Sequence, residues 1–149
     1  MCYFFPQIAS MELDILEALD FRVAVPSAFL FLKLFLWAAN ADRTMVNLSS
    51  YILDATLICY NLLHFSPSQV AAGSILVSRL STGRSPWSPK LVKFTSYQEQ
   101  QVIPVARAIL AATRSSSPRL TAVVKKYSAD RFDNVASLSL LPNGLNCTR

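Results

Sequence analysis

The sequence predicts an all-α protein, and three observations lead to that prediction. Apolar residues recur at spacings of three and four along most of the 149-residue chain, which is the period of a helix. No segment shows the sustained alternation of apolar and polar residues typical of a half-buried strand. Serine followed by proline, a pair that often starts a helix, occurs four times. The length and the 52% hydrophobic content suit one domain with its own core.

The first expected helix covers residues 8–20. Met11, Ile15 and Leu19 form an apolar stripe at i, i+4 and i+8. The carboxylates of this helix are spread around it rather than paired, so we expect them to make it soluble. The segment before Pro26 should be extended, because the residue preceding a proline disfavours the α conformation.

Residues 27–40 form the second expected helix, and they raise the question of a membrane span. The apolar run that contains this helix is close to the roughly twenty residues that a span needs. Pro26 and Ser27 interrupt the run, and Lys33 would place a charge in lipid. We therefore expect the buried central helix of a domain, with the Lys33 amine reaching the surface. A small membrane-associated helical protein is the alternative.

Two further helices are expected over about residues 46–63 and 66–80. The only histidine, His64, should lie at the end of the third helix and stabilise its dipole. The pattern S-x-x-Q from Ser66, with proline after the serine, predicts a capping box. Residues 71–73 are Ala-Ala-Gly, so another helix should approach the fourth helix closely there.

The last helices are short or interrupted. A loop with two prolines leads to a short helix from Pro89. Residues 97–113 form the next helix, in which Pro104 should cause a kink or mark a late start. A Ser-Pro pair should cap a last helix over residues 119–128, and we expect the chain to fray beyond Phe132.

The charges are unevenly distributed along the chain. The net charge is +5, but residues 1–75 hold three basic and six acidic side chains, whereas residues 76–149 hold eleven and three. A basic half could face nucleic acid or an acidic partner. Aromatic residues are not interleaved with the basic ones, so we expect a solvated surface and no nucleic-acid partner.

No catalytic motif is present. Three glycines exclude a GxGxxG or Walker loop, and one histidine cannot build a histidine-based metal site. The three cysteines are far apart, which suits neither a disulfide framework nor zinc and favours a reducing compartment. We expect no catalytic residue, no metal, no cofactor and no small-molecule substrate. Proline-directed kinases phosphorylate Ser-Pro pairs, but three of the four pairs are better explained as helix caps. Ser85 lies in the exposed loop and is the exception.

Four segments follow the order and motifs of one protein family. From Met11, MELDILEALDFRVAVPSAFLFL fits M-E-x-x-I-L-x-x-L-x-F-x-φ-x-x-P-[ST]-x-x-x-F-L, where φ is apolar. SPSQVAAG carries the signature P-S-x-x-A-A. Trp87, Thr95 and Tyr97 fit W…TGY, although Ser96 replaces the glycine. AVVKKYSADRFDNVA fits A-V-x-x-K-Y-S-x-x-x-F-x-x-V-[SA]. Together they resemble the mitotic, A/B-type cyclins over roughly residues 10–140.

The resemblance implies a fold and its boundaries. The fold would be a cyclin-like five-helix repeat preceded by one extra helix. Residues 26–140 would form the C-terminal cyclin box, and residues 8–25 the last helix of the N-terminal box with its linker. We expect residues 1–7 to be a non-native or disordered leader and residues 141–149 to be a disordered tail.

The resemblance also implies a function, which is binding and activation of a cyclin-dependent Ser/Thr kinase in cell-cycle control, in the nucleus and cytoplasm. The kinase-binding residues carried over by motif position are Glu12, Leu16, Phe21 and Val23. Glu12 would pair with a basic group, and the three apolar residues would pack under the regulatory helix of the kinase. For Phe21 and Val23, covering the protein's own core is an equal alternative. Since most of the N-terminal box is missing, we expect poor activation and a sticky first helix.

Two other interpretations concern function and the start of the chain. The alternative function is a cyclin-fold scaffold or adaptor that binds no kinase, such as a transcription-factor-like core that uses the basic half to bind nucleic acid.

Residues 2–7 could be encoded by TGC TAT TTC TTC CCC CAG, which looks like the 3′ end of an intron. We hypothesise read-through from an intron and lost upstream exons, with a short isoform as the alternative, and sequencing of the full-length transcript tests this.

Overall fold

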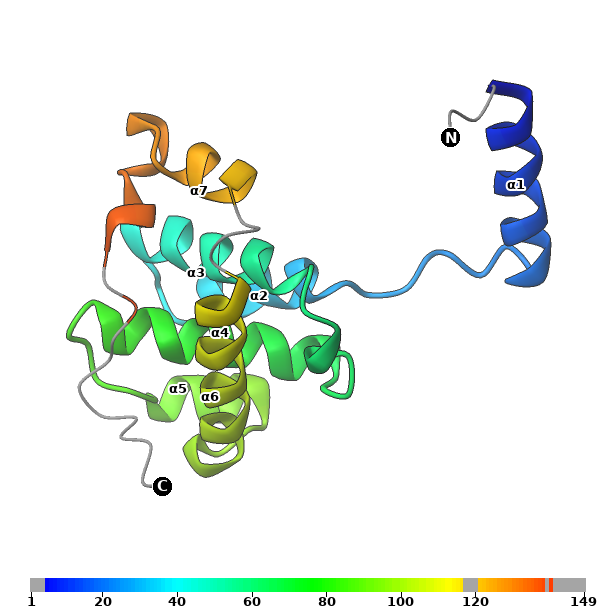
Figure 1. The fold of residues 1–149 in the computed structure, drawn as a ribbon. Coiled ribbons are helices and arrows are strands. Elements are labelled where there is room, and N and C mark those ends of the chain that lie inside the picture. The colour runs from blue at the N-terminus through cyan, green and yellow to red at the C-terminus, as the bar shows by residue number, and fades with distance from the viewer. Residues whose placement is uncertain (1–4, 117–120, 139, 141–149) are drawn as a thin grey trace.

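The computed structural model describes residues 5–116, 121–138 and 140, and within these residues the secondary structure is helical, with no β-strand. The α-helices are α1 (Phe5–Ala18), α2 (Ala28–Ala38), α3 (Arg43–Thr56), α4 (Pro67–Ser81), α5 (Pro89–Thr95), α6 (Glu99–Ser116) and α7 (Thr121–Tyr127). Short 3-10 helices are η1 (Tyr60–Leu62), η3 (Asp130–Phe132) and η4 (Val135–Ser137). Figure 1 shows α2–α7 gathered in one bundle and α1 held away from it. The prediction of an all-α fold with one helix before the bundle is confirmed, although the described part of the bundle has six α-helices, α2–α7, rather than the five expected.

The centre of the bundle is α4. Its ten residues from Val70 to Arg79 are all buried, because α2, α3 and α6 pack around it. The closest approach is at Gly73, where an added Cβ would lie 2.9 Å from side-chain carbons of Val105 and Ile109 on α6. The predicted close approach at the small residues is therefore confirmed. The capping box at Ser66 is also present, with both of its hydrogen bonds.

The helix α2 is not the buried central helix that we expected. It buries one face, made of Leu32, Phe35, Leu36 and Ala38, against the bundle. The opposite face is exposed to solvent, and Trp37 on it is 76% exposed. The Lys33 amine does reach the surface, where its Nζ lies 4.8 Å from the centre of the Phe29 ring. Among the described residues, no helix has the length and apolar character needed to cross a bilayer.

The helix α3 begins earlier and ends earlier than predicted. Asp42 caps its start, accepting a hydrogen bond from the Met45 N–H at 3.0 Å, which lowers the pKa of that carboxyl. The helix ends at Thr56, whose hydroxyl donates to a carbonyl of the last turn. Residues 57–63 therefore form a turn and η1 rather than a helix. His64 lies outside α3, so its predicted dipole role at the end of that helix is wrong, and its ring packs against Phe65 with the two planes tilted.

The helices α5 and α6 begin near their predicted starts. Ser88 caps α5 by accepting from the Leu91 N–H. Pro104 lies inside α6, which begins at Glu99, so a late start at the proline is wrong. Between the two helices, Ser96 adopts a left-handed backbone with φ +61°. This explains why the family motif has glycine there, since glycine has no Cβ to oppose that conformation.

Residues 133–138 do not fray, contrary to our expectation for the chain beyond Phe132. Val135 in η4 is fully buried and packs with the core, and η4 contacts α3. The helix α7 also contacts α3, through hydrogen bonds from the Lys126 amine and the Tyr127 hydroxyl to Asp54, at 2.8 and 3.0 Å. The bond to Asp54 raises the pKa of Lys126. The expected cap at residues 117–118 and the expected tail at 141–149 lie outside the described residues.

Candidate functional site

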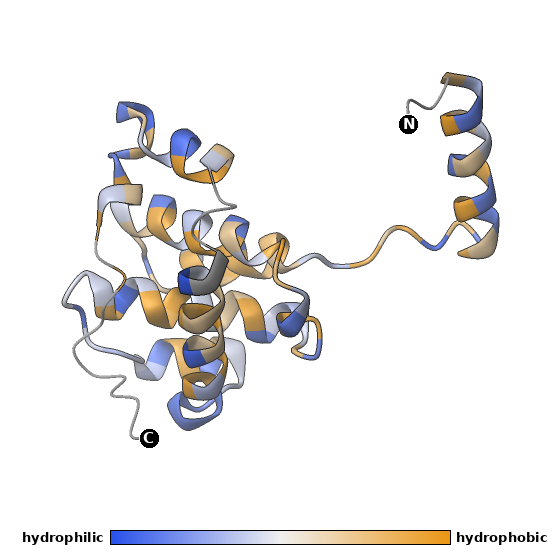
Figure 2. Cartoon of the chain, in the orientation of Figure 1, coloured by the Kyte–Doolittle hydropathy of each residue, from blue (hydrophilic) through white to orange (hydrophobic). Residues whose placement is uncertain are grey.

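The helix α1 is amphipathic and has no buried residue. It begins at Phe5, so residues 5–7 of the expected leader are helical. Figures 1 and 2 show it at the end of an extended segment, with apolar and polar positions alternating around its surface. The large apolar side chains that it and its C-cap expose are Phe5, Ile8, Met11, Leu13, Ile15 and Leu19. Because these side chains have no partner in the bundle, α1 presents an apolar surface for contact with another molecule.

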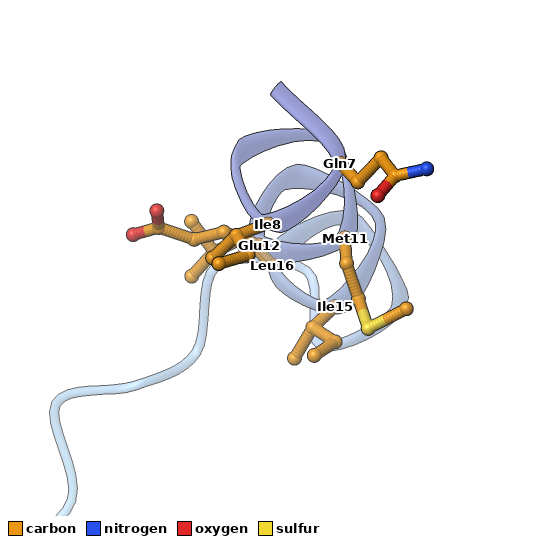
Figure 3. Close-up of a pocket in the computed structure, with 6 residues that line it drawn as sticks. All are labelled: Gln7, Ile8, Met11, Glu12, Ile15 and Leu16. Carbon is orange, nitrogen blue, oxygen red and sulfur yellow. The ribbon is translucent and has the colours of Figure 1, made fainter. Parts of the chain in front are cut away.

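Two rows of side chains on α1 form a shallow groove. Figure 3 shows Ile8, Glu12 and Leu16 pointing to one side of the helix, with Met11 and Ile15 on the neighbouring side. This follows from the helical period, which places residues i, i+4 and i+8 one above another. The groove is lined by Gln7, Ile8, Met11, Glu12, Ile15 and Leu16. Glu12 thus supplies a carboxylate to a row that is otherwise apolar.

A turn without glycine joins α1 to the extended segment. Asp20 and Phe21 both have a left-handed backbone, with φ of 49° and 53°. The Phe21 N–H donates to the Leu16 carbonyl at 2.9 Å, and the Asp20 N–H donates to the Glu17 carbonyl at 3.0 Å. These two bonds are those of a Schellman motif, which satisfies carbonyls at a helix end. The turn fixes the direction in which the chain leaves α1.

The structure places all four predicted site residues on this one continuous segment. Glu12 and Leu16 share a row of α1 and line the groove, whereas Phe21 and Val23 follow the turn and lie outside the groove. Leu16 is half-buried, and the other three are exposed. Phe21 and Val23 are 60% and 59% exposed, so neither covers the core of the bundle. The alternative that they serve the protein's own core is therefore not supported.

The segment is acidic. Its four carboxylates are those of Glu12, Asp14, Glu17 and Asp20, and the first basic residue after them is Arg22. Arg22 lies 3.8 Å from Asp20, but both side chains are about four-fifths exposed, so this pair adds little. An acidic surface with exposed apolar side chains suits a partner that presents basic groups around an apolar patch.

Sequence reasoning missed a second exposed apolar surface, formed by α2 and α5. Its large side chains are Phe29, Leu30, Leu34, Trp37 and Phe94. Trp37 and Phe94 touch, with ring centroids 6.0 Å apart. The signal was available, because an amphipathic helix of the bundle should carry a polar stripe and α2 has only Lys33. We had interpreted that lack of polar residues as burial on all sides.

The described residues form no metal-binding cluster beside these surfaces. Among the described residues, no three His, Cys, Asp or Glu side chains lie close enough together to hold a metal ion. The Asp54–Lys126–Tyr127 group joins α3 to α7. Burial raises the pKa of the Tyr127 hydroxyl, and its hydrogen bond to Asp54 raises it further. These groups hold two helices together, and the exposed surface of α1 and the following segment remains the candidate site.

Comparison with known proteins gives one family. Residues 26–141 match the model of the cyclin C-terminal domain. G2/mitotic-specific cyclin-B of Patella vulgata is 33% identical over 132 residues, which are 88% of this chain and 32% of that protein. G2/mitotic-specific cyclin-B2 of Oryzias luzonensis is 32% identical over 139 residues, covering 91% and 35%. G2/mitotic-specific cyclin-3 of Saccharomyces cerevisiae is 30% identical over 131 residues, covering 88% and 31%. The chain spans about a third of the length of these curated relatives.

Proposed function

The chain belongs to the cyclin family, matching its C-terminal domain, and we propose that it binds a cyclin-dependent Ser/Thr kinase as a regulatory subunit without catalysis of its own. Its relatives are mitotic cyclins, which supports a role in the cell cycle. The observation that carries the proposal is the exposure of α1 and the segment after it, where the motif positions for kinase contact fall.

The four residues have distinct chemical roles in the proposed contact. Glu12 is exposed at the groove and offers a carboxylate to a basic group of the kinase. Phe21 and Val23 are already exposed, so a partner can bury them without opening the bundle. Burying such a side chain contributes roughly 1.5–3 kcal/mol. Leu16 lies beside Glu12 on α1 and would pack against the same helix of the kinase.

Activation would follow from differential binding. A regulatory subunit shifts the kinase toward the conformation that it binds more tightly. The rigid turn at Asp20 and Phe21 supports this role, since it holds the apolar side chains of the segment at a defined angle to α1. The preorganised surface lowers the ordering cost of association.

The proposal is tested by calorimetric titration of the 149-residue chain into a purified monomeric cyclin-dependent kinase. We expect saturable binding that Phe21→Ala weakens about tenfold or more, in line with the loss of a buried aromatic anchor. Leu57→Ala is the matched control, because Leu57 is 78% exposed on the bundle, far along the chain from α1. This control should leave the dissociation constant unchanged.

Other outcomes identify the alternatives. If no cyclin-dependent kinase binds the chain, or if Leu57→Ala weakens binding as much as Phe21→Ala, the proposed surface is wrong. Binding of duplex DNA or RNA without any kinase would favour the adaptor instead. A phosphorylation assay with a peptide substrate then separates binding from activation.

We also propose that the chain works in the nucleus and the cytoplasm. The support is its family, because a regulator of cell division would act on proteins of both compartments. Imaging of a fluorescent fusion through the cell cycle tests this, and confinement to a membrane-bound organelle would contradict it.

A further inference from the structure

The Ser-Pro pairs of the chain differ in what their serine hydroxyls do. Ser66 and Ser88 are helix N-caps, and their hydroxyls accept hydrogen bonds from the backbone of their own helices. Ser85 caps nothing. It is exposed in the loop between α4 and α5, and Pro86 follows it. Among the Ser-Pro pairs that the structure describes, Ser85 is therefore the one whose hydroxyl does not cap a helix.

The hydroxyl of Ser85 instead accepts a hydrogen bond from a buried arginine. Arg79, in the last turns of α4, is only 9% exposed. Its Nη2 donates to Ser85 Oγ at 3.2 Å, and its Nε donates to the Ser85 carbonyl at 2.7 Å. No carboxylate lies within ion-pair distance of Arg79 among the described residues. The guanidinium, which stays charged in proteins, is thus held by two neutral oxygens of one residue.

A second arginine adds to the positive charge at this loop. Arg84 precedes Ser85 and pairs with Asp42, the N-cap of α3. Burial lowers the pKa of Arg79, and the positive charge of Arg84 lowers it further. Arg84 thus has a carboxylate partner, whereas Arg79 has none among the described residues, and its positive charge is left unbalanced beside the Ser85 hydroxyl. Burying an uncompensated charge is costly, so an anion placed here would be stabilised.

We propose that Ser85 is a phosphorylation site of proline-directed Ser/Thr kinases, and that Arg79 and Arg84 form a ready-made binding site for the resulting phosphate. Phosphoserine carries close to two negative charges at neutral pH and three strong acceptor oxygens. The bond from Arg79 already points at Oγ, so the new phosphate oxygens arise next to an arginine donor. Arginine matches phosphate oxygens with paired donors.

The phosphoryl transfer balances with ATP as the second substrate. The Ser85 oxygen forms a bond to the γ-phosphorus, and the bond between that phosphorus and the β–γ bridging oxygen breaks. ADP leaves, and the hydroxyl proton passes to a carboxylate base of the modifying kinase. The modifying kinase can bind the loop at Ser85 and Pro86, because Gly83, Arg84 and Ser85 are all exposed.

The phosphate would fasten the loop to α4. The loop leads directly to Trp87, which is buried and donates its indole N–H to the Tyr97 carbonyl at 2.9 Å. The same stretch ends in the cap of α5 at Ser88. Charge-assisted bonds from Arg79 to phosphorylated Ser85 therefore stabilise the α4–α5 connection and raise the thermal midpoint of the protein.

The first test locates the phosphate. The 149-residue chain is incubated with ATP and a proline-directed kinase that is active without any cyclin, so that failure here is independent of kinase binding by this protein. Intact mass spectrometry and peptide mapping should show one phosphate on Ser85. Ser85→Ala and Pro86→Ala should abolish it, whereas Ser66→Ala and Ser88→Ala should retain it. A phosphate found only at other serines, or none, overturns the proposal.

The second test asks whether the arginines hold the phosphate. In a peptide with the sequence of residues 82–90, the second phosphate pKa should be about 6 by phosphorus NMR. In the folded phosphoprotein we expect about 5.5 or lower, because the two guanidinium groups favour the dianion. Arg84→Gln should move the value back toward that of the peptide, and Arg79→Gln should do so further if it folds. Arg107→Gln, at an exposed position of α6, is the control. Equal values in peptide and folded protein overturn the phosphate-binding role.

Discussion

The helices α2 and α4 lie side by side in the bundle, but their burial is the opposite of what their composition suggests. α2 has one polar side chain, Lys33, yet about half of its surface faces solvent. α4 contains serines and an arginine, yet ten consecutive residues are buried. Both helices contact three others, since α4 packs against α2, α3 and α6, and α2 packs against α3, α4 and α5. The comparison teaches that the placement of the neighbouring helices decides burial, whereas composition alone does not: ten consecutive residues of α4 are buried, whereas α2 buries one face.

Buried polar side chains of α4 make hydrogen bonds at Ser74, Ser78 and Arg79, although the buried Oγ of Ser81 has no partner. Ser74 donates its hydroxyl to the Val70 carbonyl at 2.9 Å, within the same helix. Thr113 on the facing helix α6 does the same with the Ile109 carbonyl at 3.0 Å. A short hydroxyl that bonds to its own helix is buried at little cost. Polarity is therefore a weak guide to exposure for serine and threonine in these helices.

The sharpest test of the comparison uses two leucines of α2. Leu32 is 1% exposed and Leu34 is 46% exposed. Leu32→Ala should lower the free energy of unfolding by about 2–5 kcal/mol, because it leaves a cavity against the core. Leu34→Ala should change it by less than about 0.5 kcal/mol. Urea unfolding followed by circular dichroism measures both, and equal losses would mean that the exposed face of α2 is packed in solution.

The second test concerns the close contact between α4 and α6. In an exposed helix, Gly→Ala stabilises by about 1 kcal/mol. Gly73→Ala should instead destabilise by about 1–2 kcal/mol, since the new methyl group meets Val105 and Ile109 at 2.9 Å. A double-mutant cycle with Val105→Ala should show favourable coupling. Stabilisation by Gly73→Ala alone would show that the two helices are further apart than described.

The third and smallest effect compares the two N-caps. Ser66 makes both bonds of a capping box, whereas the hydroxyl of Ser27 makes no cap bond to α2. Ser66→Ala should cost about 1 kcal/mol, and Ser27→Ala no more than a few tenths. Thermal unfolding of the two variants at equal concentration compares them. If Ser27→Ala lowered the stability more than Ser66→Ala, α2 rather than α4 would be the helix with the stronger N-cap.

Local signals predicted much of the fold, because they depend on a few neighbouring residues. Ser88 was located as a cap from a serine–proline pair, Ser66 from such a pair together with the S-x-x-Q pattern, and the close approach at Gly73 from the small residues beside it. The errors concern contacts between distant segments. α2 was expected to be buried because nothing in its sequence shows on which sides other helices cover it. The burial of Val135 also depends on packing between η4 and α3, which lie far apart in sequence.

The candidate site was reached by motif position, and its geometry could not have been predicted. Glu12 and Leu16 share a row because they are four residues apart, which the sequence does indicate. The left-handed turn at Asp20 and Phe21 has no such signal, since glycine usually marks it. The contacts of the Arg79 guanidinium could not be predicted either, because they depend on how the loop that contains Ser85 folds back onto α4.

The burial of Val135 has a consequence for the order in which the protein can be made. The α3 face that receives η4 leaves the ribosome long before Val135, with the whole of α4, α5 and α6 still to be synthesised. At roughly 5–20 residues per second, that face stays uncovered for several seconds. During this interval it is available to chaperones or to other nascent chains. A stop codon placed before Asp133 would make the exposure permanent, because it would remove both Val135 and the Asp133 that pairs with Arg43 and Asn47 on α3.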